Sequence, residues 1–349
     1  MILNKLLFLL KRQKVILTAG KGRETAEEAI FRVIARHFKI GKEIIICDYA
    51  DKDADFFFKK SRLPILVVSH IGEYHPEKEF FAGDIDRVKK IEKLASSLPS
   101  HTYLILNFDD ETVRELKNKS MAHPITFGFG MRADVRATDI VLTQFPARGT
   151  NFKINHEGNI VPCWLENLFG KENIYAALAA VSAGLVLGLN LVEVSEALKD
   201  FKGLPGIMQL VAGIKNSLIL NDSKNASPLS MLESLEILKK IDGAQRKIAV
   251  LGDMVGAGKY AIEAHETIGE KVKGSADLLF TVGERARFFA QGAKNKGMAE
   301  DKIFQFDDAL SAAKALQNEI KEGDFILIDG SKEMSMIEVV KEIKAGPIV

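Results

Sequence analysis

Cysteine, excess charge and long apolar runs are all scarce in this sequence, and each scarcity excludes a class of protein. Its 349 residues include only two cysteines, Cys47 and Cys163. They match neither a metal-binding spacing nor a dense disulfide framework, so we expect a cytoplasmic protein. Lysine and arginine total 48 against 47 aspartate and glutamate residues, and this balance gives no indication of a nucleic-acid partner or an anionic membrane surface.

The N-terminal segment contains the apolar run Leu6–Leu10. This run is far too short to span a bilayer, and it lacks the small-residue cleavage site of a signal peptide. We therefore predict no transmembrane segment and a short amphipathic helix that leads into the fold. A peripheral membrane anchor is the alternative.

The remaining composition is that of a globular protein, with 47% hydrophobic and 27% charged residues. The length suits two domains. Strand and helix patterns alternate in both halves, which predicts parallel sheets covered by helices on both faces, the α/β class. A boundary near Lys202–Gly206 gives predicted domains at residues 1–203 and 204–349.

The predicted elements come from apolar periodicity. The strands are Val15–Leu17, Glu43–Cys47, Ile65–Ser69, Tyr103–Asn107, Ile125–Gly128, Ala133–Leu142, Phe152–Cys163, Ser217–Leu220, Lys247–Leu251, Leu278–Val282 and Phe325–Ile328. The helices are Glu24–Phe38, Asp84–Leu98, Glu111–Lys119, Ile174–Leu189, Val192–Phe201, Pro228–Lys240, Ala261–Val272, Ala286–Lys296, Ala309–Ile320 and Met336–Lys344.

A glycine-containing turn follows the first predicted strand. It spans Thr18–Arg23, includes Gly20 and Gly22, and leads directly into the helical period of Glu24–Phe38. A strand, a glycine turn and a helix in this order present the free N–H groups of the helix N-terminus to a phosphate. The turn is therefore the candidate phosphate site.

Several short motifs, taken together and in order, resemble those of the Mur ligase family. In the second half they are Asn221–Pro228 (NDSKNASP), Lys247–Met254 (KIAVLGDM), His265 with Gly269, and Gly323–Met336 (GDFILIDGSKEMSM). In the first half they are Ile71–His75 (IGEYH), Asn107–Asp110 (NFDD), Phe127–Gly128, Ala133–Val135 and Ala137. The likeness is strongest to the family branch that adds D-alanyl-D-alanine to the muramoyl tripeptide, and it covers Lys14 to Ile343.

The resemblance implies a central P-loop NTPase-like domain followed by a C-terminal Rossmann-like domain. It also implies ATP and Mg²⁺ as cofactors of an active member, in which an amine attacks an acyl phosphate to give an amide. The family's separate N-terminal domain, which holds a UDP-sugar, has no expected counterpart here. Only about 14 residues precede the first strand, too few for a domain.

By the resemblance, the nucleotide would be bound by Gly20, Gly22, Arg23 and Thr25. The loop departs from the family pattern at two positions. Arg23 replaces the phosphate-contacting lysine, and Glu24 stands where a hydroxyl would bind Mg²⁺, which makes Glu24 a candidate metal ligand. Either the loop still binds a nucleotide, or it is a turn that only joins strand to helix.

Two further candidate metal ligands follow from the resemblance, Asp48 and His75. The plain alternatives are a strand-end aspartate and a surface histidine. Lys89 is the candidate for the family's carbamylated catalytic lysine, with Lys90 as the second choice. The alternative is a solvated basic helix face.

In the second half, Asn225 matches a family asparagine that would contact adenine or ribose. The alternative is a helix-entry turn capped by Ser227 with Pro228 in the first helical position. Ile207 replaces a nucleotide-contacting arginine of the family.

The closing motif has lost basic groups that would serve an anionic substrate or acyl phosphate. Asp329 replaces a family lysine, and Ser335 replaces an arginine. His265 persists, and it is the second candidate catalytic residue beside Lys89.

Two function classes remain open. The first is an active ATP-dependent carboxylate–amine ligase that takes small-molecule substrates. The second, which we favour, is a degenerate relative with impaired ATP binding that acts through a protein partner such as a Mur ligase or another cell-wall enzyme. For this class, the alternative to ATP and Mg²⁺ is no cofactor. The sequence names neither the substrates nor the partner.

Two local expectations can be compared directly with a structure. We expect Leu6, Leu7, Phe8 and Leu10 to pack on the body of the protein or on a partner. We also expect the carboxylate of Glu24, in the first turn of its helix, to occupy the phosphate position and to repel a nucleotide.

Overall fold

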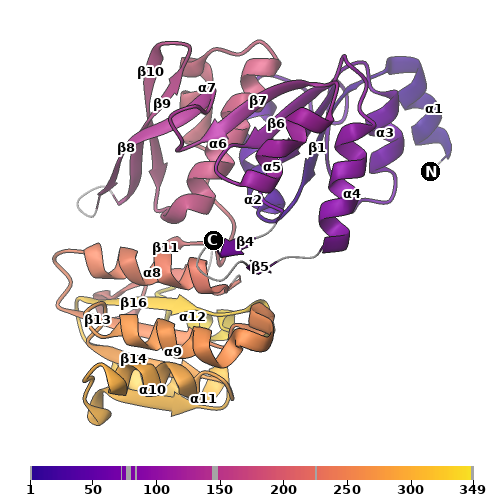
Figure 1. Cartoon of the computed structure of the whole chain (residues 1–349). Coiled ribbons are helices and arrows are strands. Elements are labelled where there is room, and N and C mark those ends of the chain that lie inside the picture. Colours follow the sequence, from indigo (N-terminus) through magenta and orange to yellow (C-terminus); the bar gives the residue numbers. More distant parts are fainter. Residues whose placement is uncertain are drawn as a thin grey trace. The chain divides into compact units, whose positions relative to one another are not determined.

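The computed structural model describes residues 2–71, 73–75, 80–82, 85–143, 148–224 and 226–346. The chain forms two compact units (Figure 1). The first comprises residues 1–143, 150–166 and 171–203, and the second comprises residues 144–149, 167–170 and 204–349. We retain residues 1–203 and 204–349 as the proposed domains.

The first unit contains a sheet of eight strands in the described residues, in the order β10-β9-β8-β7-β6-β3-β1-β2. The pairs from β2 to β8 are parallel. The elements are α1 (Ile2–Lys11), β1 (Lys14–Ala19), α2 (Arg23–Ala35), β2 (Ile44–Asp48), α3 (Ala54–Lys60), β3 (Pro64–Val68), β4 (Glu73–His75), β5 (Phe80–Ala82), α4 (Ile85–Ser96), β6 (Tyr103–Asn107), α5 (Glu111–Arg114), η2 (Glu115–Lys119), β7 (His123–Gly128), β8 (Val135–Thr143), β9 (Gly149–His156), β10 (Asn159–Glu166), α6 (Gly170–Val186) and α7 (Leu191–Leu198).

Alternation along the central strands of the first unit divides the core between the two faces of the sheet. Val15 and Leu17 of β1 join a cluster with side chains of α1, α3, α4 and α5. Ile16, equally buried, points to the opposite face because successive strand residues alternate. On that face α2 packs against α6, where Val33 lies beside Gly184.

The second unit contains a six-stranded sheet in the described residues, in the order β11-β12-β16-β13-β14-β15. Strand β11 is antiparallel to β12, and the other pairs are parallel. The elements are β11 (Gln209–Ala212), η3 (Ile214–Asn216), β12 (Leu218–Asp222), α8 (Pro228–Lys240), β13 (Arg246–Gly252), η4 (Val255–Tyr260), α9 (Ala261–Val272), β14 (Leu278–Val282), α10 (Arg287–Asn295), η5 (Glu300–Lys302), β15 (Ile303–Phe306), α11 (Ala309–Glu319), β16 (Asp324–Asp329), η6 (Lys332–Met334) and α12 (Ile337–Ile343).

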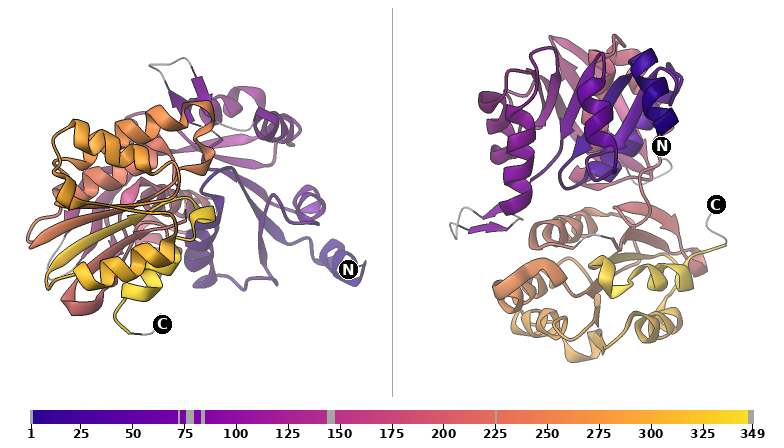
Figure 2. Two further views of the ribbon diagram at one scale, coloured as in Figure 1. Left: turned by 90° about the horizontal axis from the view of Figure 1, so that it is seen from below. Right: turned by 90° about the vertical axis from the view of Figure 1, so that its right-hand side faces the viewer.

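Helices cover both faces of the second sheet. Helices α8, α9 and α10 lie on one side, and α11 and α12 lie on the other (Figure 2). The α11–α12 side buries a continuous apolar cluster with Ile248, Val250, Ile326 and Ile328 of the central strands. This arrangement confirms the predicted α/β class.

Several local predictions need correction. The predicted helix Glu111–Lys119 is a short α5 followed by the 3₁₀ helix η2, and the predicted strand Phe152–Cys163 is the hairpin β9–β10. Its turn, Glu157–Gly158, has positive φ at both residues, as a two-residue hairpin turn requires. Helix α3 and strands β11 and β15 were not predicted, because each is too short to show a clear period.

The predicted lead-in helix is confirmed as α1. Phe8 is buried and packs edge-on against Phe57. Leu10 is 77% exposed, so it does not pack on the body, and its packing on a partner stays a prediction. The side chains of Leu6 and Leu7 lie outside the described residues. In the described part of the chain, no helix combines the length and apolar character needed to cross a membrane.

Candidate functional site

The turn between β1 and α2, the candidate phosphate site, depends on two glycines. Gly20 and Gly22 both have positive φ, 93° and 76°. A side chain at Gly20 would collide with the carbonyl oxygen of His70, which accepts a hydrogen bond from the Lys21 amide at 2.6 Å. Gly22 precedes α2, and no side chain caps the helix there. The glycines are therefore needed by the turn itself, with or without a nucleotide.

Arg23, the predicted phosphate contact, is already paired. Its Nε lies 2.6 Å from Oδ2 of Asp48, the predicted metal ligand at the end of β2, and its Nη1 donates to the carbonyl of Gly20 at 3.3 Å. Both side chains of the pair are partly exposed, 26% for Arg23 and 18% for Asp48. Two residues predicted to hold ATP and Mg²⁺ instead neutralise each other.

Thr25, the next predicted nucleotide contact, is also engaged. Its hydroxyl donates to Oε1 of Glu172, in the first turn of α6, at 2.7 Å. The Glu172 carboxylate lies 3.7 Å from the place where a Cβ on Gly22 would stand. The carboxylate against this turn therefore belongs to Glu172, whereas Glu24, which we expected there, has an exposed side chain.

The N-x-D-D segment after β6 holds neighbouring loops in place. Asn107 accepts a hydrogen bond from the Asp109 amide with Oδ1 and donates to Nε2 of His70 with Nδ2. This fixes His70 as the tautomer protonated at Nδ1, which faces Oδ2 of Asp110 at 3.5 Å. Burial alone would raise the pKa of Asp110, but hydrogen bonds from His70, Val113 and Ile71 hold it below its usual value.

Asp109 binds the loop that follows β7. Its two oxygens accept the amides of Phe129 at 2.6 Å and Gly130 at 2.9 Å, and Oδ2 also accepts the Tyr175 hydroxyl at 3.1 Å. A side chain at Gly128 would collide with this carboxylate. The sequence motif signalled Asp109, but not Tyr175 or Glu172, which come from a helix far along the chain.

Two predicted site residues of the first unit remain, His75 and Lys89. No contact between described residues joins either of them to the turn between β1 and α2 or to Asp109 and Asp110. The backbone of His75 lies in β4, but its side chain lies outside the described residues. Lys89 lies on α4 with an exposed side chain. Among the residues that the structure describes, no group of three or more histidine, cysteine, aspartate or glutamate side chains is placed to hold a metal.

At the corresponding edge of the second sheet, the chain enters α8 through a capped turn. The Ser227 side chain accepts from the Ser230 amide, the Ser230 side chain accepts from the Ser227 amide, and Pro228 occupies the first helical position. This is the structural alternative predicted for the motif. Asn225 lies outside the described residues, so its nucleotide contact stays a prediction. Ile207 is buried.

His265 is fully buried, which argues against the catalytic or substrate role predicted for it. Its Nε2 accepts from the Met254 amide at 3.1 Å, and its Nδ1 donates to the Ala261 carbonyl at 2.5 Å. Burial lowers the pKa of His265, which favours the neutral ring. The histidine links the start of η4 to α9, and its catalytic or substrate role stays a prediction.

Asp329, at the end of β16, is fully buried as well. Its Oδ2 accepts the Ser234 hydroxyl of α8 at 2.6 Å, and no described residue makes a hydrogen bond with its Oδ1. Burial raises the pKa of Asp329 to about 7. The residue that replaces a family lysine is therefore a core residue of the second unit.

Two domain families match most of the chain. The Mur ligase middle domain matches residues 8–184, and the Mur ligase glutamate ligase domain matches residues 208–332. The middle-domain match alone covers more than half of the 349 residues, so the chain belongs to the Mur ligase family.

Among curated relatives, the UDP-N-acetylmuramoyl-tripeptide–D-alanyl-D-alanine ligase of Bacillus subtilis is 24% identical over 95% of this chain and 76% of its own length. The ligase of the same name from Escherichia coli is 27% identical over 72% of this chain and 54% of its own length. Among solved structures, MurF from Acinetobacter baumannii aligns with 97% of this chain and 78% of its own, with a TM-score of 0.77 and 21% identity.

A second solved structure, MurF from Thermotoga maritima in complex with ADP, aligns with 98% of this chain and 82% of its own. The TM-score is 0.76 and the identity 19%. These likenesses show that the two units have the fold of the ligases. The candidate phosphate site is a separate matter, because the sequence departs from the family pattern there at Arg23 and Glu24.

Proposed function

We propose that this chain is a Mur ligase-type protein of peptidoglycan precursor synthesis whose nucleotide site is closed by its own side chains. The observation that carries the proposal is the Arg23–Asp48 ion pair, with 2.6 Å between Nε and Oδ2. A phosphate at the turn would have to take Arg23 from a carboxylate that already neutralises it. The bond between Thr25 and Glu172 adds a second negative group beside the turn.

The residues present do not fit Mg²⁺-ATP. Asp48, a proposed metal ligand, is paired with Arg23, and the side chain in the position of the Mg²⁺-binding hydroxyl is Glu24. Burial and the neighbouring Asp48 and Asp51 also raise the pKa of Glu27, which marks this corner as already rich in negative charge. We therefore derive no catalytic step through the nucleotide.

The alternative is an active ATP-dependent carboxylate–amine ligase. One observation favours it: the turn keeps Gly20 and Gly22 in the left-handed region, and α2 begins without a side-chain cap. Backbone N–H groups at such a helix start bind phosphate well. In this alternative, nucleotide binding breaks the Arg23–Asp48 pair and turns Arg23 to the phosphate.

A degenerate member acts through a protein partner, and we propose a full-length Mur ligase of the same cell. The end of α1 offers an apolar contact, because Leu9 and Leu10 are 42% and 77% exposed. Cys47 and Cys163 are free thiols, which suits the cytoplasm, where the precursor pathway is expected. Loss of co-purification in Leu10→Glu tests the contact.

Calorimetric titration of the full chain with ATP, with and without Mg²⁺, tests the closed site. We expect an affinity weaker than millimolar for the wild-type chain. The double variant Arg23→Lys with Glu24→Thr should bind at least about tenfold more tightly, because it restores the lysine and the hydroxyl. Asp48→Asn should also improve binding, because it releases Arg23.

A matched control uses the same kinds of substitution further along α2. Arg32 and Glu28 form an exposed ion pair there, with 2.6 Å between Nε and Oε1. Arg32→Lys with Glu28→Thr should leave ATP binding unchanged. Micromolar, Mg²⁺-dependent ATP affinity in the wild-type chain would favour the active ligase and reject the closed site.

A further inference from the structure

A cavity of about 360 Å³ opens in the second unit, at the end of the sheet where the parallel strands begin. Leu218 is the first residue of β12, and Asp324 and Phe325 are the first two of β16. Asp222 and Asp329 lie at the carboxyl ends of the same two parallel strands, within the family motifs. The cavity is therefore separate from the candidate site, and its volume lies within the range of small-molecule pockets, about 300–1,000 Å³.

The walls of the cavity are mainly apolar. Phe169, Leu210, Ile241 and Phe325 line it, and each is less than a tenth exposed. They come from the segment before α6, from β11, from the end of α8 and from β16. Because these buried side chains belong to four separate segments of the folded unit, the cavity is present without a ligand, as is usual for small-molecule sites.

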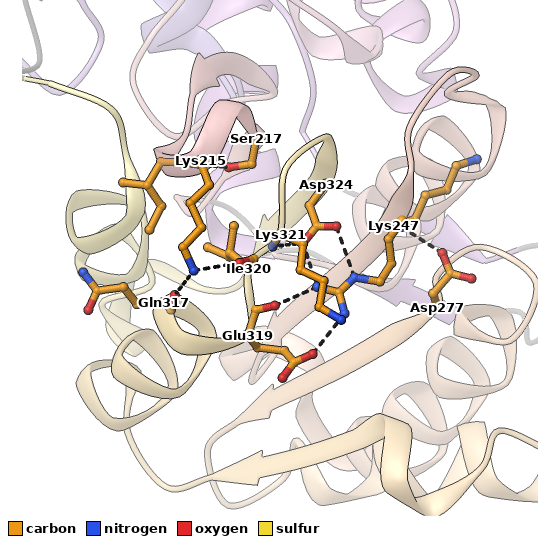
Figure 3. Close-up of polar contacts among 11 residues, drawn as sticks. Lys215, Ser217, Lys247, Asp277, Gln317, Glu319, Ile320, Lys321 and Asp324 are labelled. Carbon is orange, nitrogen blue, oxygen red and sulfur yellow. Dashed lines mark hydrogen bonds and ion pairs between the residues drawn. The ribbon is translucent and has the colours of Figure 1, made fainter.

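Asp324, a lining residue at the start of β16, is held in a network of hydrogen bonds and ion pairs (Figure 3). Arg246 binds both oxygens of Asp324, at 3.1 and 2.8 Å, and also donates to the Glu319 side chain at 3.0 Å. The Lys215 ammonium donates to the carbonyls of Gln317 and Ile320 at the end of α11. Asp324 therefore presents no free charge to the cavity, although it is one of the lining residues.

Arg148, a further lining residue, is a cation without a partner in the described part of the chain. Its Nε is buried from solvent and has no hydrogen bond. No ion pair of the described residues involves its guanidinium. An unmet buried donor is unfavourable, and a guanidinium meets a carboxylate with two parallel hydrogen bonds.

The loop between α8 and β13 adds neutral backbone groups to the lining. Gly243 and Ala244 line the cavity between α8 and β13, and no hydrogen bond of the described residues uses either amide. Asp242, in the same loop, also lines the cavity, and its side chain is exposed to solvent. An anionic group at Arg148 would find an unmet donor, while its hydrocarbon would lie on the apolar walls.

We propose that this cavity binds an organic carboxylate with an apolar body. The carboxylate pairs with Arg148, and the apolar body packs against Phe169, Leu210 and Phe325. This site is independent of the phosphate turn, so its occupancy does not depend on whether the chain binds ATP.

The test compares an acid with its neutral analogue on the full wild-type chain. The probes are 4-phenylbutanoate and 4-phenylbutan-1-ol, which share the apolar body and differ in charge. In titration calorimetry near neutral pH, we expect the acid to bind at least about tenfold more tightly than the alcohol. Equal affinities, or no binding of the acid at millimolar concentration, would overturn the proposal without any mutation.

Two variants then place the site. Arg148→Gln should weaken binding of the acid at least about tenfold and leave binding of the alcohol within about twofold. Leu218→Trp, which fills the cavity, should weaken both probes. Arg132→Gln changes an exposed arginine of the first unit and should alter neither. Unchanged acid binding in Arg148→Gln, with the fold intact by circular dichroism, would reject Arg148 as the anchor.

Discussion

The polar residues at the strand ends of the two units differ in how far water reaches them. In the first unit, Arg23 and Asp48 pair at the surface, with about a quarter and a fifth of each side chain exposed. In the second unit, His265 and Asp329 have no exposed surface. A motif residue of the first unit can therefore exchange its partner for a ligand, whereas one of the second unit cannot do so without opening the core.

Burial also shifts the pKa values of His265 and Asp329. It lowers the pKa of His265 and raises that of Asp329 to about 7, so both groups favour the neutral form. A neutral, hydrogen-bonded polar group is what an apolar interior tolerates. The strand-end residues of the first unit, Arg23 and Asp48, form a surface ion pair, whereas His265 and Asp329 of the second unit are part of its core.

The largest effect should come from removing His265. His265→Ala leaves the Met254 amide without its acceptor and opens a space beside Phe289, whose ring centre lies 4.5 Å from that of the histidine. We expect a loss of about 3–4 kcal/mol in the free energy of unfolding, measured with urea. His101→Ala, at an exposed histidine, is the control and should change stability by less than about 0.5 kcal/mol.

A different result would break the comparison between the units. If His265→Ala kept its stability but lost a ligase activity, then His265 would be catalytic and its burial would not reflect a role in folding.

The next effect concerns the pH dependence given by Asp329. Between about pH 4, where an unfolded aspartate ionises, and about pH 7, the folded chain retains a proton that the unfolded chain has lost. Stability should therefore fall as pH rises through this window, by up to about 1.4 kcal/mol per pH unit. Asp329→Asn removes this contribution, so the unfolding free energy of the variant should depend less on pH. Relative to wild type, the variant should be most stable at high pH, where the wild-type carboxyl must ionise.

The control for this measurement is Asp301→Asn, at an exposed aspartate of η5. It should keep the wild-type pH profile. Parallel profiles for wild type and Asp329→Asn would mean that Asp329 is already ionised in the folded chain.

The smallest effect should come from the surface pair of the first unit. Asp48→Asn removes the charge that faces Arg23, but a partly exposed ion pair contributes about 1 kcal/mol or less. We expect a loss within that limit in urea unfolding. Asp55→Asn, which breaks the exposed Lys59–Asp55 pair of α3, gives the reference for a fully solvated pair. A loss above about 3 kcal/mol would make Asp48 a structural residue like Asp329.

Much of the fold could be predicted because capping residues, turn glycines and apolar runs determine the structure of their own segments. Ser227 and Pro228 start α8, Gly20 and Gly22 shape the first turn, and the apolar run of β13 forms a central strand. The motifs also indicated the Mur ligase family, which the domain matches confirm. Helix α3 escaped prediction because seven residues span only two helical turns.

The candidate site was predicted less completely, because its contacts join residues far apart in the chain. Thr25 and Glu172 are separated by 147 positions, and their hydrogen bond exists only because α2 and α6 pack together. Asp48 and Arg23 were both predicted, but as a metal ligand and a phosphate contact. The expectation that they face a nucleotide overlooked that β1 and β2 are neighbours, which brings the two charges together.

By itself, the sequence determined the class of fold and the family, since apolar periodicity, turn residues and short motifs are local properties. It also determined where the chain departs from the family pattern. Ile207, Asp329 and Ser335 replace basic residues, and Glu24 replaces a neutral hydroxyl, whereas Arg23 keeps the positive charge of the lysine. Only the tertiary structure decided what the remaining polar groups do. Pairing and burial depend on which segments meet, and they turned His265 and Asp329 into core residues, closed Arg23 onto Asp48 and left Arg148 at a cavity without a partner in the described residues.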